Sequence, residues 1–139
     1  MTNTPGVNVD ILVVRGNKLL LGLLNEKWCE AGIQVYGVPG RDIRFGEKMG
    51  ETVKRNIIEE FNCGVSSYQI ISVNANYAQG NHYIGIGVWA EIDGEPKLLL
   101  AEDWEKWEWF DKDQIPNNLH PATHNLIECY LQSKVNIAE

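Results

Sequence analysis

The sequence has few basic residues and no long apolar segment. Its 12 lysines and arginines are outnumbered by 19 aspartates and glutamates, which gives a net charge of −7. A chain of this charge lacks the basic face that binds duplex nucleic acid, so we expect no such partner. No apolar run approaches the roughly 20 residues of a membrane span, so we expect no membrane association. A small anionic substrate stays compatible with the negative charge, because a bound metal ion inverts the local field.

Cysteine is also scarce. The three cysteines, Cys29, Cys63 and Cys129, are widely spaced and include no C-x-x-C metal or redox pair. An odd number at such spacings is typical of reduced, buried thiols. The first residues, 1–5, lack the charged and apolar regions of a secretory signal. We therefore expect a cytoplasmic protein whose cysteines have no role in a site.

The length and patterning predict one globular domain over residues 1–139. The chain is 44% hydrophobic and 22% charged, which is ordinary for a globular protein, and it has no repeat or linker. Residues 7–14 and 19–24 predict a β-hairpin around the turn Arg15-Gly16-Asn17-Lys18. Further strands are expected at 33–36, 42–45, 65–73, 82–92 and 104–110, with polar connections at 25–32 and 74–81.

Two helices are expected. In residues 48–62, Met49, Val53, Ile57 and Phe61 recur every four residues and form one apolar stripe, and Asn62-Cys63-Gly64 supplies the stop. Residues 121–133 form the second, with Leu126, Ile127, Tyr130 and Leu131 on one face. This order of elements predicts an α+β domain with a mixed sheet between helices.

One face of the first helix carries acidic chemistry. Asn56, Glu59 and Glu60 stand at i, i+3 and i+4, so they share a face beside the apolar stripe. Neighbouring carboxylates repel each other unless a cation lies between them, and Mg²⁺ prefers such oxygen ligands. The alternative interpretation is a solvated acidic helix face.

The surrounding residues resemble the Nudix box of the MutT-like hydrolases, G-x5-E-x7-R-E-U-x-E-E-x-G-U, in which U is bulky and aliphatic. Glu47, Arg55, Ile57, Glu59 and Glu60 match the box, and Pro39-Gly40 and Phe45-Gly46-Glu47 resemble the loop that opens it. The resemblance implies a Nudix fold, a mixed β-sheet sandwiched between α-helices. It also implies a strand–loop–helix that binds a divalent metal and a diphosphate.

Five positions depart from the box. Arg41 and Asn62 replace glycines, Arg44 stands where an acid is common, and Cys63 is a marginal match for the final aliphatic residue. Asn56 replaces a glutamate that is often a metal ligand. An asparagine oxygen can bind a metal, but it brings no charge and cannot act as a base.

The second half of the chain resembles the small Nudix nucleotide diphosphatases. The residues that carry this resemblance are Asn81-His82-Tyr83, Glu95-Pro96-Lys97 and 104–110. It implies Mg²⁺-dependent (or Mn²⁺-dependent) cleavage of a diphosphate linkage in a nucleotide, either a nucleoside triphosphate or a nucleoside diphosphate-X. It also implies a homodimer, and the dense tryptophans of 104–109 agree, because aromatic residues are enriched at interfaces.

The resemblance assigns roles residue by residue. Glu47, Arg55 and Glu60 are the expected catalytic residues, and Arg55 orients a box carboxylate such as Glu47. The base is open among Glu47, Glu60 and the loop acids Glu102, Asp103 and Glu105. The expected metal ligands are the Gly40 carbonyl, Asn56, Glu59 and Glu60, and the substrate-binding candidates are Arg41, Arg44, His82 and Trp109. Sheet packing is the alternative role for Trp109, as a structural hydrogen bond is for His82.

Two other classes of function stay open. Asn56, Arg41 and Asn62 are also compatible with a catalytically weak domain that binds a nucleotide or metabolite as a sensor. An interaction module with a vestigial site is the third possibility. The retained Glu47, Arg55, Glu59 and Glu60 argue against complete decay, because metal binding needs these side chains and folding does not.

Overall fold

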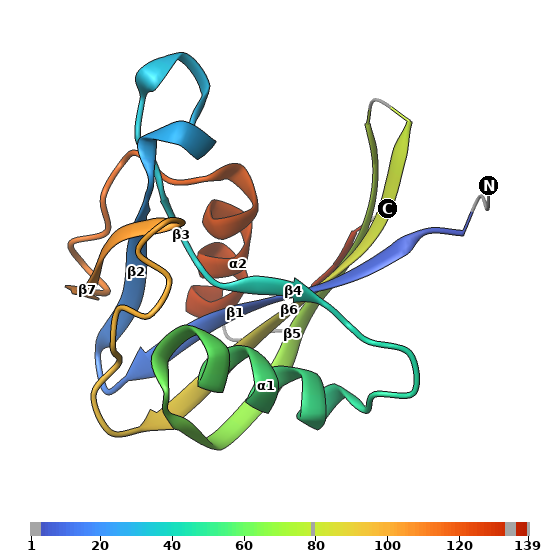
Figure 1. Cartoon of the computed structure of the whole chain (residues 1–139), viewed down its shortest axis with the longest axis horizontal. Helices are drawn as coiled ribbons and strands as arrows, with labels where there is room; N and C mark the ends of the chain where they lie inside the picture. Colours follow the sequence, from blue (N-terminus) through green and yellow to red (C-terminus); the bar gives the residue numbers. More distant parts are fainter. Residues whose placement is uncertain (1–3, 79, 133–135, 139) are drawn as a thin grey trace.

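The chain forms one mixed sheet with a helix on each face (Figure 1). The computed structural model describes residues 4–78, 80–132 and 136–138. The helices are α1 (Met49–Phe61) and α2 (Pro121–Gln132), and short 3-10 turns span Glu26–Trp28 and Glu30–Gly32. The strands are β1 (Gly6–Arg15), β2 (Lys18–Leu24), β3 (Tyr36–Gly37), β4 (Gly40–Asp42), β5 (Gly64–Ala78), β6 (Asn81–Asp93), β7 (Trp104–Asp111) and β8 (Asn136–Ala138).

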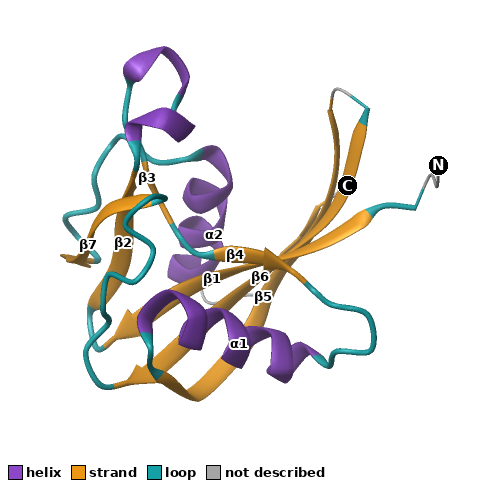
Figure 2. Ribbon diagram, viewed as in Figure 1, coloured by secondary structure: helices purple, strands orange, loops and turns teal. Residues whose placement is uncertain are grey.

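The sheet is mixed because β1 lies parallel to β6 and antiparallel to β2 and β4. Among the described residues the strand order is β3-β2-β1-β6-β5-β8, with β4 paired to β1 and β7 to β2. Figure 2 shows the long β5–β6 hairpin extending beyond the helices. The predicted α+β architecture, a mixed sheet between helices, is confirmed.

Each face of the sheet packs against one helix. Val53, Ile57 and Phe61 of α1 are fully buried against Val9, Ile11 and Val13, which point to one side of β1. Leu126, Ile127 and Cys129 of α2 pack with Leu12 and Val14 on the other side of β1. Successive side chains of β1 point to opposite faces of the sheet, and those named here are apolar on both faces. This is expected for a central strand that is covered on both sides.

The end of α1 explains one departure from the box. Asn62 caps the helix in the left-handed conformation, with φ at 56°. Asparagine and glycine are the residues that adopt this conformation most readily at a helix end. The replacement of the box glycine by Asn62 therefore leaves the backbone turn intact.

Several predicted boundaries were wrong. Residues 74–81 are not a connection, because β5 and β6 stay paired up to Ala78 and Asn81. The strand predicted at 33–36 is confined to Tyr36–Gly37, and the one predicted at 42–45 lies at Gly40–Asp42. On α2, Leu131 is 44% exposed, whereas Cys129 is buried. The expected last helical residue, Ser133, lies outside the described residues. Neither described helix is long and apolar enough to cross a membrane.

Candidate active site

Arg55 and Glu47 form a two-pronged ion pair across the start of α1. Arg55 Nε lies 2.8 Å from Glu47 Oε2, and Arg55 Nη2 lies 3.0 Å from Glu47 Oε1. Glu47 Oε1 also accepts hydrogen bonds from the Thr52 hydroxyl at 2.7 Å and the Arg44 backbone N–H at 3.0 Å. Arg55 Nη2 donates to the Asp42 carbonyl at 2.8 Å. Arg55 thus orients the Glu47 carboxylate, as the sequence predicted. Together these contacts hold the loop between β4 and α1 in place.

These hydrogen bonds favour the charged form of Glu47. The bond from Arg55 contributes most, followed by Thr52 and the Arg44 backbone, and together they lower the pKa of Glu47 from 4.5 to about 2. Glu47 is therefore ionised throughout the neutral range, with its carboxylate held by donors of the protein.

A pH dependence of stability follows from Glu47. Because its folded pKa is lowered, its stabilising contribution is present above pH 4.5 and is lost as the pH falls toward 2. We expect Glu47→Gln to flatten the fall of the melting temperature between these values. Calorimetric melting at pH 5, 4 and 3 measures this, with Glu128→Gln on the exposed side of α2 as the control. Parallel pH profiles for the wild type and Glu47→Gln would contradict it.

Arg41 lies against the acidic face of α1. Its guanidinium nitrogens lie 3.6 Å from Glu59 Oε2 and 3.5 Å from Glu60 Oε1. Glu59 also pairs with Arg55 at 3.5 Å and with Arg44 at 3.8 Å. The two carboxylates predicted to hold a metal are therefore balanced here by three arginines of the chain. In the described part of the chain, no three His, Cys, Asp or Glu side chains are grouped closely enough to hold a metal ion.

Two oxygens on this face nevertheless fit a cation. Asn56 is fully buried, and its Nδ2 donates to the Thr52 carbonyl at 3.2 Å while its Oδ1 has no hydrogen-bond partner among the described residues. Glu60 is only 4% exposed, and its Oε2 is also buried without a partner there. Burial raises the pKa of Glu60, and Arg41 opposes this effect. Because buried polar atoms are rarely left unpaired, these oxygens suit a hard cation such as Mg²⁺.

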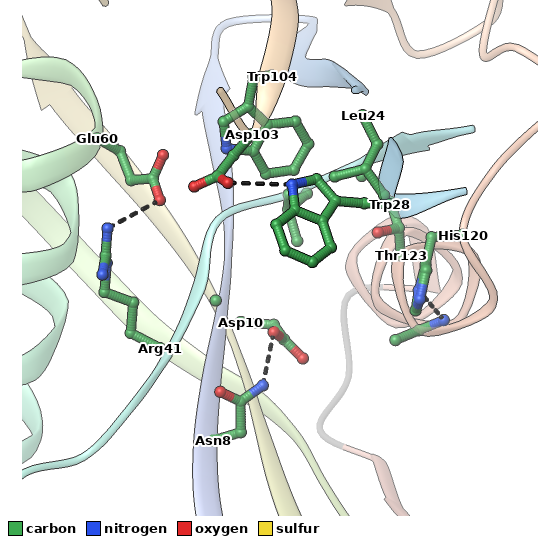
Figure 3. Close-up of a pocket in the computed structure, with 14 residues that line it drawn as sticks. Asn8, Asp10, Leu24, Trp28, Arg41, Glu60, Asp103, Trp104, His120 and Thr123 are labelled. Carbon is green, nitrogen blue, oxygen red and sulfur yellow. Dashed lines mark hydrogen bonds and ion pairs between the residues drawn. The ribbon is translucent and has the colours of Figure 1, made fainter. Parts of the chain in front are cut away.

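A cavity of about 470 Å³ opens beside Glu60, between the end of α1 and the start of α2 (Figure 3). We call it the aromatic pocket, because Trp28 and Trp104 form part of its wall. Trp28 Nε1 donates to Asp103 Oδ1 at 3.1 Å, which ties the loop before β7 to the 3-10 turn. The other residues that line it are Asn8, Asp10, Leu24, Gly37, Val38, Gly40, Arg41, Glu60, Asp103, His120, Ala122 and Thr123.

Asp10 is an acid in the floor of this pocket. Its Oδ1 accepts a hydrogen bond from Asn8 Nδ2 at 3.1 Å. Burial raises its pKa from 3.8 to about 6, and the bond from Asn8 offsets part of that rise. The carboxylate leans over Gly40, where a Cβ atom would collide with Asp10 Oδ1. Any side chain at position 40 would therefore displace the Asp10 carboxylate from this position.

Asp10→Asn is expected to stabilise the fold at pH 8. An acid whose folded pKa is raised destabilises the folded state above that pKa, and the effect disappears as the pH falls below its ordinary value. The shift from 3.8 to about 6 corresponds to at most about 3 kcal/mol. Urea unfolding at pH 8 and near pH 3.5 tests this, with the exposed Asp113→Asn as the control. A gain that is equal at both pH values would show that ionisation of Asp10 is not its cause.

The structure brings most of the predicted site residues together. Glu47, Arg55, Glu59, Glu60, Arg41 and Arg44 are joined by the contacts given above, and Gly40 and Asn56 lie beside them. His82 does not join them: it lies on the exposed β5–β6 hairpin, 5.9 Å from the Tyr77 ring. Trp109 pairs with Leu20 in the sheet and stacks under Arg15 at 4.8 Å. Of the three loop acids, Asp103 lines the aromatic pocket, whereas Glu102 and Glu105 are exposed.

Sequence reasoning missed Asn8, Asp10, Trp28 and His120. Asn8 and Asp10 interrupt an otherwise apolar central strand, and this interruption is the signal that could have identified them. His120 lies just before α2, where its Nδ1 accepts a hydrogen bond from the Ala122 backbone N–H at 3.2 Å. Trp28 is 59% exposed in a polar loop, and nothing in its local sequence indicates the pocket.

Solved structures share this architecture over at least 90% of the chain. A MutT NUDIX hydrolase from Burkholderia pseudomallei has a TM-score of 0.77 and 27% identity, covering 90% of this chain and 97% of that one. A NUDIX hydrolase from Nitrosomonas europaea has a TM-score of 0.77 at 18% identity, covering 96% and 93%. An ADP-ribose pyrophosphatase from Streptococcus suis has a TM-score of 0.71 at 14% identity, covering 98% and 100%.

No protein-family model matches the sequence. The structural likeness extends over nearly the full length of each of these proteins. The chain that shows this likeness also carries the residues that match the Nudix box. The chain therefore has the Nudix fold, which is the fold that its resemblance to the Nudix hydrolases implied.

Proposed function

We propose that the protein is a Mg²⁺-dependent hydrolase that cleaves a diphosphate linkage in a nucleotide. The observation that carries the proposal is the pair of unpartnered buried oxygens, Asn56 Oδ1 and Glu60 Oε2, on one face of α1. Glu59 lies on the same face, and Arg41 and Arg44 lie over it. A face of this kind combines oxygen ligands for a cation with guanidinium groups for phosphate.

The residues of the site have two roles: some would hold the metal ion, and others would bind the nucleotide. Asn56, Glu59 and Glu60, with the Gly40 carbonyl, would hold Mg²⁺ or Mn²⁺, which when bound neutralises phosphate charge and activates water. Arg55 keeps Glu47 in place and fixes the loop that carries Arg41 and Arg44. When a diphosphate arrives, these two arginines can exchange their carboxylate contacts for bidentate contacts to phosphate oxygens. The nucleobase would lie in the aromatic pocket, where Trp28 and Trp104 offer stacking surfaces.

Two residues remain as candidates for the general base that activates water, Glu60 and Asp103. Glu47 is a poor candidate, because donors of the protein occupy both of its oxygens. Glu60 can act as the base only while its unpartnered Oε2 is not bound to the metal, whereas Asp103 lies in the same pocket wall and is not assigned to the metal. A group that abstracts a proton from water must have an oxygen free to accept it.

One observation favours a second candidate function, a catalytically weak nucleotide sensor. The guanidinium of Arg41 lies between Glu59 and Glu60, so a cation that enters must compete with it. If Arg41 stays between the two carboxylates and excludes the cation, the domain would bind a nucleotide without hydrolysing it.

A nucleotide panel distinguishes the two functions. Nucleoside triphosphates and nucleoside diphosphate sugars are incubated with Mg²⁺ or Mn²⁺, and pyrophosphate and phosphate release are followed. Turnover that requires the metal supports the hydrolase. Binding without turnover supports the sensor, and neither binding nor turnover supports an interaction module.

A further inference from the structure

Buried side-chain atoms without a hydrogen-bond partner gather on the acidic face of α1. Among the described residues there are four such atoms, and three of them, Arg41 Nε, Asn56 Oδ1 and Glu60 Oε2, belong to side chains of this face. The fourth is Trp107 Nε1. Because buried polar atoms are rarely left unpaired, a donor and two acceptors unpaired at one place need an explanation. Arg41 neutralises the charge of this face, but it does not satisfy the hydrogen bonds there.

Arg41 is held on this face mainly by charge. Its guanidinium nitrogens lie 3.6 Å from Glu59 and 3.5 Å from Glu60, beyond the roughly 3.2 Å of an ordinary N–H···O hydrogen bond. Arg55, in contrast, donates to Glu47 at 2.8 and 3.0 Å. Among the described residues, Arg41 is also the one basic side chain within ion-pair distance of Glu60. Arg55 is therefore fixed in its contacts, whereas Arg41 can exchange its partners at little cost.

The side chain of Arg41 lies where two cavities meet. Its backbone is fixed, because Arg41 of β4 pairs with Val9 of β1. In the aromatic pocket its guanidinium points toward Glu60 (Figure 3). Arg41 also lines a neighbouring hollow, which we call the arginine hollow because Arg44 and Arg55 line it too. From one fixed backbone position, this long side chain can therefore reach a carboxylate in one cavity or an anion in the other.

A cation on this face and the guanidinium of Arg41 exclude each other. A cation held by Asn56 Oδ1 and Glu60 Oε2 would lie beside Arg41, and like charges a few ångströms apart repel strongly in a buried site. Asn56 is neutral, so the face has too little negative charge to hold a divalent cation and a guanidinium together. Phosphate oxygens in the arginine hollow would offer the displaced guanidinium a bidentate partner, including the acceptor that Arg41 Nε lacks.

We propose that Arg41 is an internal counter-ion, which lies on Glu59 and Glu60 in the metal-free protein and moves to the phosphate groups when the metal ion binds. This inference rests on the proposed function for the presence of both ligands. One side chain then opposes the binding of the metal ion and supports the binding of the diphosphate. The protein therefore holds the metal ion weakly by itself and tightly only together with the diphosphate.

Calorimetry of Arg41→Gln tests the inference through two effects of opposite sign. Without nucleotide, the variant should bind Mg²⁺ about tenfold more tightly than the wild type. At saturating Mg²⁺, it should bind methylenediphosphonate, a diphosphate analogue that is not hydrolysed, about tenfold more weakly. Lys54→Gln is the matched control, because it removes the same charge from an exposed position on the opposite side of α1 from Asn56, and it should behave as the wild type.

A single structural defect would not move the two affinities in opposite directions. Binding of Mg²⁺ to Arg41→Gln that is absent, unchanged or weaker than in the wild type would overturn the inference. So would binding of methylenediphosphonate that is absent from the wild type or undiminished in the variant.

Melting temperatures in EDTA test the resting position of Arg41 without any ligand. Arg41→Gln leaves the buried carboxylate of Glu60 without its basic neighbour, so the variant should melt a few degrees lower than the wild type. Either Mg²⁺ or the second substitution Glu60→Gln should restore the loss. If Arg41→Gln does not fold in EDTA, the double variant decides, because it is expected to fold there. An unchanged melting temperature of Arg41→Gln, or failure of both rescues, would overturn the inference.

The nucleotide panel is read separately. Absence of turnover of every nucleotide by the wild type refutes the proposed hydrolase and leaves the calorimetric and melting comparisons valid. Metal-dependent turnover by the wild type, together with an affinity for Mg²⁺ that Arg41→Gln does not raise, refutes the role of Arg41 and leaves the hydrolase intact.

Discussion

Glu60→Gln is expected to reduce metal-dependent hydrolysis by about 100-fold or more while leaving the protein folded. Glu60 carries the unpartnered buried oxygen that we assign to the metal, and it lines the aromatic pocket. Loss of roughly 3 kcal/mol of transition-state stabilisation corresponds to this factor. The substitution keeps the shape of the side chain and removes its charge. Initial rates with saturating Mg²⁺ give the measurement.

Unfolding of the Glu60→Gln variant is not expected to be the cause of its loss of activity. Burial disfavours the charged form of Glu60, so glutamine at this position should leave the melting temperature unchanged or raise it. Glu91→Gln on the exposed end of β6 is the matched control and should keep full activity. Activity of Glu60→Gln within a few-fold of wild type would show that Glu60 is not a principal ligand.

Asn56→Glu is expected to tighten Mg²⁺ binding and to raise activity about tenfold. The substitution restores the third carboxylate of the helix face at a position whose oxygen is already buried and unpartnered. A unit charge about 4 Å from a cation contributes several kcal/mol at an effective dielectric constant of about 20, and desolvation offsets part of this. A net gain of only about 1.4 kcal/mol gives the tenfold increase.

The control for this variant is Ile58→Glu. Ile58 is 54% exposed on the same helix, so it adds the same charge away from the metal face. Calorimetry with Mg²⁺ and initial rates are measured for both variants. If Asp103 replaces the missing acid, a further carboxylate at position 56 crowds the site, and the activity of Asn56→Glu stays flat or falls. No change in either quantity would mean that position 56 does not face the metal.

The sequence predicted the parts of the fold in which local pattern and tertiary packing agree. Val53, Ile57 and Phe61 repeat at helical spacing, and all three are fully buried. The β5–β6 hairpin was underestimated because Asn74 and Asn76 are polar and interrupt the apolar alternation of a strand. Both asparagines line a cavity beside α2. The predicted strands were therefore too short at the place where the sheet borders a cavity instead of the apolar core.

The site was predictable only where its residues are close together in the chain. Glu47 and Arg55 are eight residues apart, and their spacing matches a known motif. Arg41 reaches Glu59 and Glu60 across the loop that precedes α1, and no periodicity encodes that contact. Asn8 and Asp10 meet Gly85, Gly87 and His120 only because β1 pairs with β6 and α2 begins beside them.

Phosphorus NMR of one reaction mixture tests the central claim most directly. Wild-type protein is incubated with Mg²⁺ and ADP-ribose, UDP-glucose or ATP, and the diphosphate resonances are followed over time. The account predicts that these resonances are replaced by those of monophosphates, or of pyrophosphate in the case of ATP, and that the change is absent with EDTA and in Glu60→Gln. Diphosphate resonances that persist unchanged with wild-type protein and Mg²⁺ for all three nucleotides would contradict it.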